Sequence, residues 1–250
     1  MKKQVSVIIP NFNGRNYLKD CLNSLNQQHF QDFEIILVDN ASTDDSLSLA
    51  REFCPEIKTI VLSENFGFCR AVNEGIRASK APFVLLLNND TVVDPDFVGA
   101  LYEAIRGKEK VFSCASQMRK LTDPSKMDDG GDFYCALGWA FARGKDKPYE
   151  NYEKAGRIFF SCAGAAIYRR EVFEKIGYFA EVHFAYLEDL DVCYRARIMG
   201  YENWYAPKAV VYHVGSGTSG SRYNQFKTRY SSRNNIYLIY KNMPVLQNIL

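Results

Sequence analysis

The first ninety residues alternate between short apolar runs and longer segments that carry apolar side chains at helical spacing. The short runs are rich in β-branched and aliphatic residues, as buried strands are, and they cover residues 5–9, 33–38, 57–62 and 83–87. Helices are predicted between them, over residues 17–25, after a cap at Ser42 or Thr43, and over residues 66–79. This order predicts an α/β fold with a mostly parallel central sheet and helices on both faces.

The second half of the chain is less regular. Residues 117–156 are rich in Lys, Asp, Gly and Tyr without a clear period, so they predict a variable loop or insertion. Apolar order then returns at 158–160 and 162–167, followed by helices at 171–176 and 187–199 and a strand-like run at 204–213. Residues 215–220 read as a flexible loop. We expect a domain over residues 1–221 and a C-terminal helical tail over 222–250, broken near Pro244.

Composition narrows the class of protein. The chain has 250 residues, 47% of them hydrophobic, and a net charge of +2, so a sizeable core is expected and disorder is not. No basic stripe precedes the tail, which argues against a nucleic-acid partner. The seven cysteines form no CxxC pair, and no signal peptide or ~20-residue apolar stretch is present. These features predict a cytoplasmic protein with reduced thiols.

Polar residues follow four of the predicted strands, namely Asn11, Asp39, Asn65 and Asp90. Ligands bind beyond the carboxyl ends of the strands in sheets of this kind, so one edge should gather these side chains into a site. Asp39 could accept hydrogen bonds from a base or a ribose hydroxyl, or it could cap the next helix.

A diphosphate ligand would need a metal ion here, because the chain has neither GxGxxG after its first strand nor GxxxxGK[ST]. Asp90 ends the run Asn88-Asn89-Asp90, where a carboxylate could bind Mg²⁺ or Mn²⁺ while phosphates fill other positions. The same tripeptide is also good turn chemistry.

A third group of candidates opens the helix after Tyr186. Glu188 and Asp189 lie in its first turn, where the helix dipole favours ionised carboxylates and would keep a base ready near neutral pH. Acidic residues also open helices for stability alone, so the pattern by itself leaves both readings open. His213, at the end of a strand-like run, is by itself more typical of a structural histidine than of a metal ligand.

In their order along the chain, these segments resemble glycosyltransferase family 2, which has the GT-A fold, and within it bacterial rhamnosyltransferase-like enzymes. The resemblance covers about residues 4 to 215 and rests on the segments 5–14, 36–44, 64–68, 73–75, 87–90, 160–165 and 188–189. The family's metal motif is often written DxD. The first position of that motif is Asn88 here, which leaves Asp90 as the stronger ligand.

The resemblance implies an inverting transfer of a sugar from a nucleotide-diphosphate donor, either dTDP-rhamnose or a UDP-sugar. The acceptor would be a hydroxyl of a glycan or lipid-linked molecule in cell-surface polysaccharide assembly. It implies that Asp90 and His213 hold Mg²⁺ or Mn²⁺, and that Asp189 is the base beside Glu188. The residues implied to bind the nucleotide are Pro10, Asn11, Asn13, Asp39, Asn65, Gly67, Asn73 and Asn89.

Two other functions stay open beside this one. A sugar nucleotidyltransferase would need a Gly-rich loop with Arg or Lys after the first strand, whereas residues 11–17 hold one Gly and one Arg. A catalytically degenerate nucleotide-sugar-binding subunit would be consistent with Asn88.

The C-terminal tail could lie on a membrane surface or pack on its own domain. Basic and aromatic residues alternate at helical spacing over 222–250, which suits a helix lying on the anionic inner face of the cell membrane. The alternative is a helix that packs its apolar stripe on its own domain.

Overall fold

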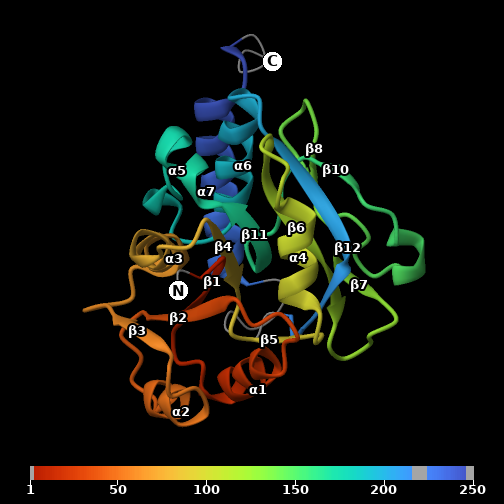
Figure 1. Cartoon of the computed structure of the whole chain (residues 1–250). Coiled ribbons are helices and arrows are strands. Elements are labelled where there is room, and N and C mark those ends of the chain that lie inside the picture. The colour runs from red at the N-terminus through yellow and green to blue at the C-terminus, as the bar shows by residue number, and fades with distance from the viewer. Residues whose placement is uncertain (1–2, 216–223, 246–250) are drawn as a thin grey trace.

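A large mixed sheet runs through the molecule between two layers of helices (Figure 1). The computed structural model describes residues 3–215 and 224–245. The sheet contains β1 (Val5–Asn11), β2 (Phe33–Asp39), β3 (Lys58–Val61), β4 (Phe83–Leu87), β5 (Thr91–Val93), β6 (Val111–Lys120), β7 (Met127–Asp129), β10 (Gly156–Ile158), β11 (Ala165–Arg169) and β12 (Glu202–His213). A separate hairpin pairs β8 (Phe133–Tyr134) with β9 (Ala140–Phe141).

The strand order is β10-β12-β6-β11-β4-β1-β2-β3, with β5 paired to β12 and β7 paired to β6. Strands β4, β1, β2 and β3 are parallel neighbours, and β6 and β12 are parallel to each other. Strand β11 runs antiparallel to both β4 and β6, so it is the reversed strand between two parallel groups that point the same way. The predicted α/β fold with a mostly parallel sheet is therefore confirmed.

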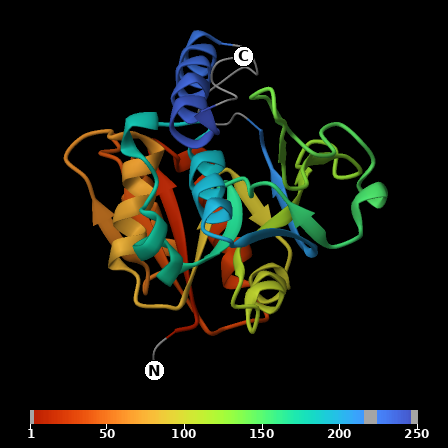
Figure 2. The same cartoon turned by 90° about the horizontal axis from the view of Figure 1, so that it is seen from above.

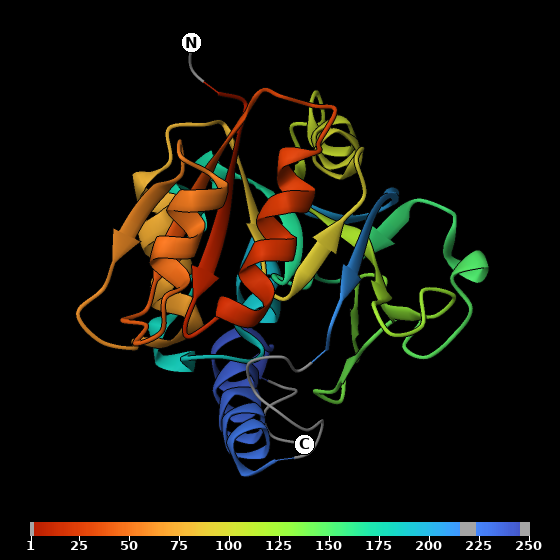
Figure 3. The same ribbon diagram turned by 90° about the horizontal axis from the view of Figure 1, so that it is seen from below.

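The helices are α1 (Arg15–Asn26), α2 (Ser46–Phe53), α3 (Gly67–Ala78), α4 (Phe97–Ile105), α5 (Arg170–Ile176), α6 (Glu188–Ile198) and α7 (Gln225–Asn242), with short 3₁₀ turns η1 (Tyr149–Tyr152) and η2 (Glu181–His183). Helices α1, α2 and α4 cover one face of the sheet, and α1 and α2 lie in front of the strands in Figure 3. Helices α3, α5 and α6 cover the opposite face, seen in Figure 2. The prediction of helices on both faces is confirmed.

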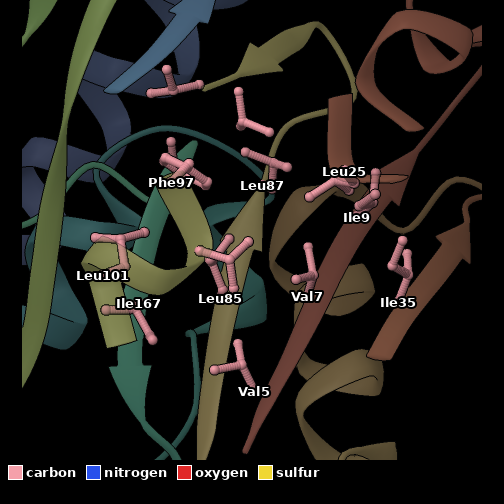
Figure 4. Close-up of a cluster of buried hydrophobic side chains, with 14 of the residues drawn as sticks. Val5, Val7, Ile9, Leu25, Ile35, Leu85, Leu87, Phe97, Leu101 and Ile167 are labelled. Carbon is pink, nitrogen blue, oxygen red and sulfur yellow. The ribbon is translucent and has the colours of Figure 1, made fainter. Parts of the chain in front are cut away.

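Alternate side chains of each central strand supply the two cores. Val7 and Ile9 of β1 and Leu85 of β4 point toward α1 and α4 (Figure 4), whereas Ile8 and Leu86 join the core under α3 and α6. Both faces of these strands are apolar because both are covered, which is why the strands read as continuous hydrophobic runs.

Several predicted boundaries were wrong or incomplete. Helix α2 begins at Ser46, so neither Ser42 nor Thr43 caps it. The apolar runs at 158–160 and 162–167 only partly coincide with strands, since β10 occupies residues 156–158 and β11 occupies 165–169. Residues 117–156 hold the end of β6, strands β7, β8 and β9 and turn η1, so this insertion is partly ordered.

The tail is helical, as predicted, and α7 ends before Pro244. The flexible loop predicted at 215–220 and the boundary at residue 221 lie mostly outside the described residues. Helix α7 packs beside α6 through a stripe spaced four residues apart, made of Asn234, Leu238 and Asn242. Among the described helices, none combines the length and hydropathy needed to cross a bilayer. All seven cysteines are free thiols.

Candidate active site

A chain of hydrogen bonds links the ends of three parallel strands. Asn11, the last residue of β1, donates from Nδ2 to Asp39 Oδ1 at the end of β2, over 2.8 Å. Asn89, just past β4, donates from Nδ2 to Asn11 Oδ1, also over 2.8 Å. All three side chains are buried. Gly14 lies so close to this chain that a Cβ there would be 2.1 Å from Asn89 Nδ2, so the bond requires a residue without a side chain. The structure thus brings three of the predicted nucleotide-binding residues together.

Asp39 organises the loop after β2 instead of capping a helix. Its Oδ2 accepts from Ser42 N over 2.9 Å, and its Oδ1 accepts from Ser42 Oγ over 2.6 Å. Asn13, which is exposed, accepts on Oδ1 from Thr43 N over 2.8 Å. These bonds draw residues 42 and 43 toward the β1 loop, which explains why helix α2 starts later than predicted.

Three of the remaining nucleotide candidates, Pro10, Asn65 and Gly67, lie close to this edge. Pro10 is half-buried and faces Val38 in the β1–β2 pairing. Asn65 is exposed, and its Oδ1 accepts from Gly67 N over 3.0 Å. Gly67 has φ of +85°, a conformation that suits glycine, and it begins α3.

Asn73 is directed away from the other candidates. Its Nδ2 donates to Phe179 O over 2.8 Å, and its Oδ1 accepts from Phe179 N over 3.0 Å. Its buried amide therefore secures the segment before η2. Asn40 is a residue that the sequence argument missed: it is buried, and its Oδ1 has no hydrogen-bond partner among the described residues.

The predicted metal residues meet at the junction of β5 and β12. The pairing of these strands sets Thr91 opposite His213, which brings His213 Nε2 to 3.3 Å from Asp90 Oδ1. The other ring nitrogen, Nδ1, lies 2.7 Å from Asp128 Oδ2 on β7. Asp128 was not predicted, although the acidic and glycine-rich run from Asp128 to Asp132 is a signal that could have singled it out.

His213 and Asp128 each have a strongly shifted pKa. Burial would lower the pKa of His213, but hydrogen bonds to Asp128 and Asp90 outweigh it and raise that pKa to about 9. Burial would likewise raise the pKa of Asp128, but the bond from His213 and the ion pair with Lys145 lower it to about 2. These hydrogen bonds favour the protonated imidazole, and a divalent metal that binds Nε2 would displace the proton there.

The donor set fits a divalent metal completed by a ligand's phosphates. Among the described residues, no three or more His, Cys, Asp or Glu side chains are arranged as a full metal site. Asp90 and His213 Nε2 nevertheless face one another, and Asp128 holds the far nitrogen of the ring. A carboxylate behind a histidine in this way is the usual orientation of a metal-binding imidazole. Mg²⁺ commonly takes one or two carboxylates from the protein and the rest from phosphates and water.

Glu188 and Asp189 begin α6, which lies on the face of the sheet opposite α1 and α4. Asp189 is half-buried, and its Oδ2 accepts from Ala163 N over 3.2 Å. Glu188 is 7% exposed, and its Oε2 has no hydrogen-bond partner among the described residues. Burial, followed by the charge of Asp189, raises the pKa of Glu188 to about 8, and burial raises the pKa of Asp189 to about 6.

The helix dipole was expected to keep a base ionised near neutral pH. Burial outweighs the dipole and raises both pKa values, but the pKa of Asp189, about 6, is still low enough for a base near neutral pH. Near neutral pH Glu188 is neutral and Asp189 is ionised, and two carboxyl groups separated in this way can take different roles.

The residues that lead into α6 have strained backbones. Phe184, Tyr186 and Leu187 have φ of 64°, 73° and 64° without being glycines. Such conformations cost about 1–3 kcal/mol each and persist only where surrounding contacts impose them. They cluster directly before the two carboxyl groups, which is where functional sites concentrate strain.

Two more buried carboxyl groups adjoin Asp189. Asp129 accepts from Gly131 N over 2.8 Å, and Asp132 accepts from Arg143 N over 2.9 Å. Burial raises the pKa of both, and the charge of Asp129 contributes to the raised pKa of Asp189. Sequence reasoning placed both in the variable insertion and gave them no role.

The family model described as Glycosyl transferase family 2 matches residues 6–177, well over half of the chain. The chain belongs to glycosyl transferase family 2. The family match covers the strand-end residues Asn11, Asp39, Asn89 and Asp90, and it ends before Asp189 and His213.

Curated relatives extend the similarity past the family match. The N-acetylglucosaminyl-diphospho-decaprenol L-rhamnosyltransferase of Mycobacterium tuberculosis is 25% identical over 245 residues, covering 88% of this chain and 79% of the relative. The putative glycosyltransferase EpsH of Bacillus subtilis is 24% identical, over 84% of this chain and 60% of its own length. The glycosyltransferase GlyG of Streptococcus pneumoniae is 29% identical over 44% of this chain. The chain spans less than two thirds of EpsH and 37% of GlyG.

Solved structures show that this family 2 chain has the GT-A fold. The mannosyltransferase PcManGT from Pyrobaculum calidifontis, in complex with GDP-Man and Mn²⁺, aligns with a TM-score of 0.66 at 17% identity, over 88% of this chain and 59% of its own. GalNAc-T7 with UDP, GalNAc and Mn²⁺ aligns with a TM-score of 0.76 at 15% identity, over 96% of this chain and 48% of its own.

Proposed function

We propose that this protein is an inverting glycosyltransferase that moves a sugar from a nucleotide-diphosphate donor to an acceptor hydroxyl. One connection carries the proposal, because it joins the candidate base to the candidate metal site through a short segment. Ala163 N binds Asp189 Oδ2 over 3.2 Å, and the next residue, Gly164, accepts from Asn88 N over 2.8 Å. Asn88 lies two residues before Asp90. Base and metal ligand are thus held by neighbouring backbone.

The donor would bind over the ends of β1, β2 and β4. Asn11, Asp39 and Asn89 shape this surface through their mutual bonds, and the exposed Asn13 and Asn65 lie on the loops beside it. Asn40 adds a buried acceptor, Oδ1, with no partner among the described residues. Together with Pro10 and Gly67, these residues would contact the nucleoside and its phosphates. Asn73 would contribute indirectly, because its side chain holds the Phe179 backbone in place. Solved relatives with this fold bind GDP-Man or UDP, which supports a nucleotide donor.

Asp90 and His213 would hold Mg²⁺ or Mn²⁺ on the donor diphosphate, with Asp128 orienting the imidazole of His213. When bound, the metal neutralises the charge that grows on the departing diphosphate. The Mn²⁺ in two solved relatives supports this assignment. Asn88, at the first position of the motif, is a poorer metal ligand than a carboxylate. We assign it a structural role instead, through the hydrogen bond from its backbone N to Gly164 O.

Asp189 would act as the base. Its carboxylate accepts the proton of the acceptor hydroxyl while that oxygen forms a bond to the anomeric carbon of the donor sugar. The bond between that carbon and the diphosphate oxygen breaks, and the nucleoside diphosphate leaves from the opposite face, so the configuration inverts. Glu188, neutral beside it, keeps a second negative charge away from Asp189.

For the substrates, we propose dTDP-rhamnose or a UDP-sugar as donor and a glycan or lipid-linked acceptor of cell-surface polysaccharide assembly. The named activity of the mycobacterial relative, on an acceptor linked to diphospho-decaprenol, supports the lipid-linked class.

Turnover tests the proposal. Purified protein is incubated with Mn²⁺, dTDP-rhamnose, UDP-sugars or GDP-sugars, and a diphospholipid-linked N-acetylglucosamine acceptor, and release of nucleoside diphosphate is measured. We expect release with at least one donor and a product of inverted anomeric configuration by NMR. Metal-dependent donor binding without release from any donor would instead indicate a degenerate binding subunit.

We also propose that α7 contacts an anionic membrane surface. One face of the helix carries Phe226, Arg229, Arg233, Ile236, Tyr237 and Tyr240. On this face Ile236 is 71% and Tyr240 82% exposed, and the helix contains four basic residues and no acidic one.

The tip of the β8–β9 hairpin adjoins α7 at Ile239, because a Cβ on Gly138 would be 2.8 Å from Ile239 Cδ1. Trp139, on that tip, is 65% exposed. Exposed aromatic and basic groups of this kind suit the interface of an anionic bilayer.

Vesicle binding tests this contact. The double variant Ile236→Asp, Tyr240→Asp is expected to sediment at least tenfold less with anionic vesicles at low salt, since it loses apolar contact and adds two negative charges. The control is Ile198→Asp, Met199→Asp at the end of α6, which removes similarly exposed apolar groups elsewhere. Equal sedimentation of both variants and the wild type, or no binding to anionic vesicles at all, would contradict the proposal.

A further inference from the structure

The loop that presents the candidate base has a strained backbone. Residues 183–187 connect η2 to α6 and include three non-glycine residues with positive φ, the last of them Leu187, directly before Glu188. A backbone in these conformations needs outside contacts to keep it there. Several of those contacts come from α7, which belongs to the far C-terminal part of the chain and crosses close to the carboxyl ends of the central strands (Figure 2).

Asn234 of α7 makes most of these contacts. Its side chain is 1% exposed, and its Nδ2 group lies 3.0 Å from His183 O, 2.8 Å from Ala185 O and 2.7 Å from Tyr186 O. An amide NH₂ has two protons, so three carbonyl groups of one loop share them. Its Oδ1 accepts from Arg233 Nε over 3.0 Å, and Arg233 Nη2 donates to Val182 O over 2.6 Å.

A second set of contacts fixes the other side of the two carboxyl groups. Asp191, in the first turn of α6, is fully buried and accepts on Oδ1 from Asn242 Nδ2 over 2.8 Å. Lys241 Nζ and Arg195 Nε lie 3.0 Å from its Oδ2. Helix α7 therefore holds the backbone before Glu188 through Asn234 and the helix after Asp189 through Asn242 and Lys241.

The same loop also touches the donor side. Phe184 O accepts from Cys69 N over 3.3 Å, and a Cβ on Gly67 would be 2.6 Å from the Phe184 ring. Asn40 Nδ2 in turn donates to Gly67 O over 3.1 Å. The ring of Phe184 stacks on Tyr230 of α7, with centroids 5.3 Å apart. The loop thus lies between the first turn of α3 and α7.

We propose that Asn234 is a positioning residue: through it, α7 holds the strained loop 183–187 in the conformation that presents Asp189 to the acceptor hydroxyl. The role rests on the proposed function, because Asp189 is the base of that reaction. Asn234 itself touches neither the donor nor the acceptor. It acts on turnover by fixing three backbone carbonyl groups, and its loss leaves the residues over β1, β2 and β4 in place.

Two variants of similar size test the role in the full chain. Asn234→Asp replaces the NH₂ donor with an acceptor that faces the same three carbonyl groups, and Asn234→Leu removes both polar atoms. Asn235→Asp and Asn235→Leu, at the neighbouring position of the same helix, are the matched controls. We expect both Asn234 variants to lower kcat at least tenfold while the calorimetric Kd for the nucleoside diphosphate stays within twofold. The pH of half-maximal rate should also move, because the surroundings of Asp189 change.

Hydrogen exchange provides a readout that does not depend on activity. Amides of residues 184–190 should exchange at least tenfold faster in both Asn234 variants, whereas amides of β1 and β4 stay protected. If the wild-type protein transfers no sugar, the proposed function fails. The exchange data would still test whether Asn234 holds the loop 183–187 in place. Unchanged exchange and unchanged kcat in both variants would overturn the positioning role. A parallel loss of kcat, nucleotide affinity and melting temperature would also overturn it, since it would show a general loss of the fold.

Discussion

Asp189→Asn is expected to lower the rate of sugar transfer by about 10²–10⁴-fold, the usual effect of removing a general base. The substitution preserves size and can keep the bond from Ala163 N to the side-chain oxygen, so the loop and β11 should stay in place. What it removes is the ability to accept a proton. Donor affinity, measured by calorimetry, should stay within about twofold.

Glu188→Gln is the matched comparison. Burial keeps Glu188 protonated at neutral pH, so an uncharged glutamine resembles the group already there, and a rate loss below about tenfold is expected. Near-normal turnover of Asp189→Asn together with an inactive Glu188→Gln would show that the two roles are exchanged.

The pH dependence of turnover follows from the same pair. The carboxylate form of Asp189 is the active form, and its pKa is raised to about 6, so kcat should rise as pH increases through about 6. For an unperturbed aspartate the rise would fall near pH 4. Because the two carboxyl groups interact, the profile reports the pair as a whole. A rate that is flat from pH 5 to 8 would contradict Asp189 as the base.

Asp90→Asn is the second substitution for which a large effect is expected. Loss of a supporting residue around a metal typically costs 10–100-fold in affinity, and a direct ligand should cost at least as much. We expect metal-dependent nucleotide affinity to fall by about 100-fold and transfer to be nearly abolished. The asparagine keeps the shape of the turn after β4, so the fold should be retained.

Asp96→Asn is the control for this loss of charge, since Asp96 is exposed and pairs with His29 on the surface. Its nucleotide affinity should equal that of the wild type. Full transfer activity of Asp90→Asn, or of the wild type in excess chelator, would show that transfer needs no metal at Asp90.

The parallel half of the sheet was predictable because its strands are buried on both faces. Runs such as 83–87 are continuously apolar, and the chain reverses through helices of regular spacing, so both periods are visible in the sequence. The polar residues after these strands then had to lie at one edge. The contacts among Asn11, Asp39 and Asn89 bear out that geometric argument.

The strands of the other half of the sheet, where parallel and antiparallel pairs mix, were harder to predict. Strand β6 is mostly buried yet contains Ser113 and Gln117, and Ser113 is satisfied inside the core by Asn203 from β12 over 2.8 Å. A strand whose polar groups pair with distant residues has no apolar alternation to reveal it. Helix α4, in contrast, does have helical spacing at Phe97, Leu101 and Ile105, and the sequence interpretation left residues 91–116 without a predicted element.

In the candidate site, the residues missed were those that act through other residues. Asp128 matters to the site because it contacts His213. The pairing of β12 with β5 and β6 brings His213 beside it, and no local sequence pattern shows that pairing. Asn234 binds carbonyl groups 48 to 51 residues earlier in the chain. Neither relation has a local sequence pattern. The raised pKa values of Glu188 and Asp189 were missed for a related reason, since burial depends on packing and the helix-terminus argument considers only the helix itself.

In the proposed function, the edge formed by β1, β2 and β4 binds a nucleoside diphosphate through a divalent metal. Calorimetric titration of the wild-type protein with UDP, dTDP and GDP, each in Mn²⁺ and in EDTA, tests it most directly. We expect at least one nucleotide to bind at least tenfold more tightly with Mn²⁺ than in EDTA. Equal affinity in EDTA, or no binding of any of the three, would contradict it.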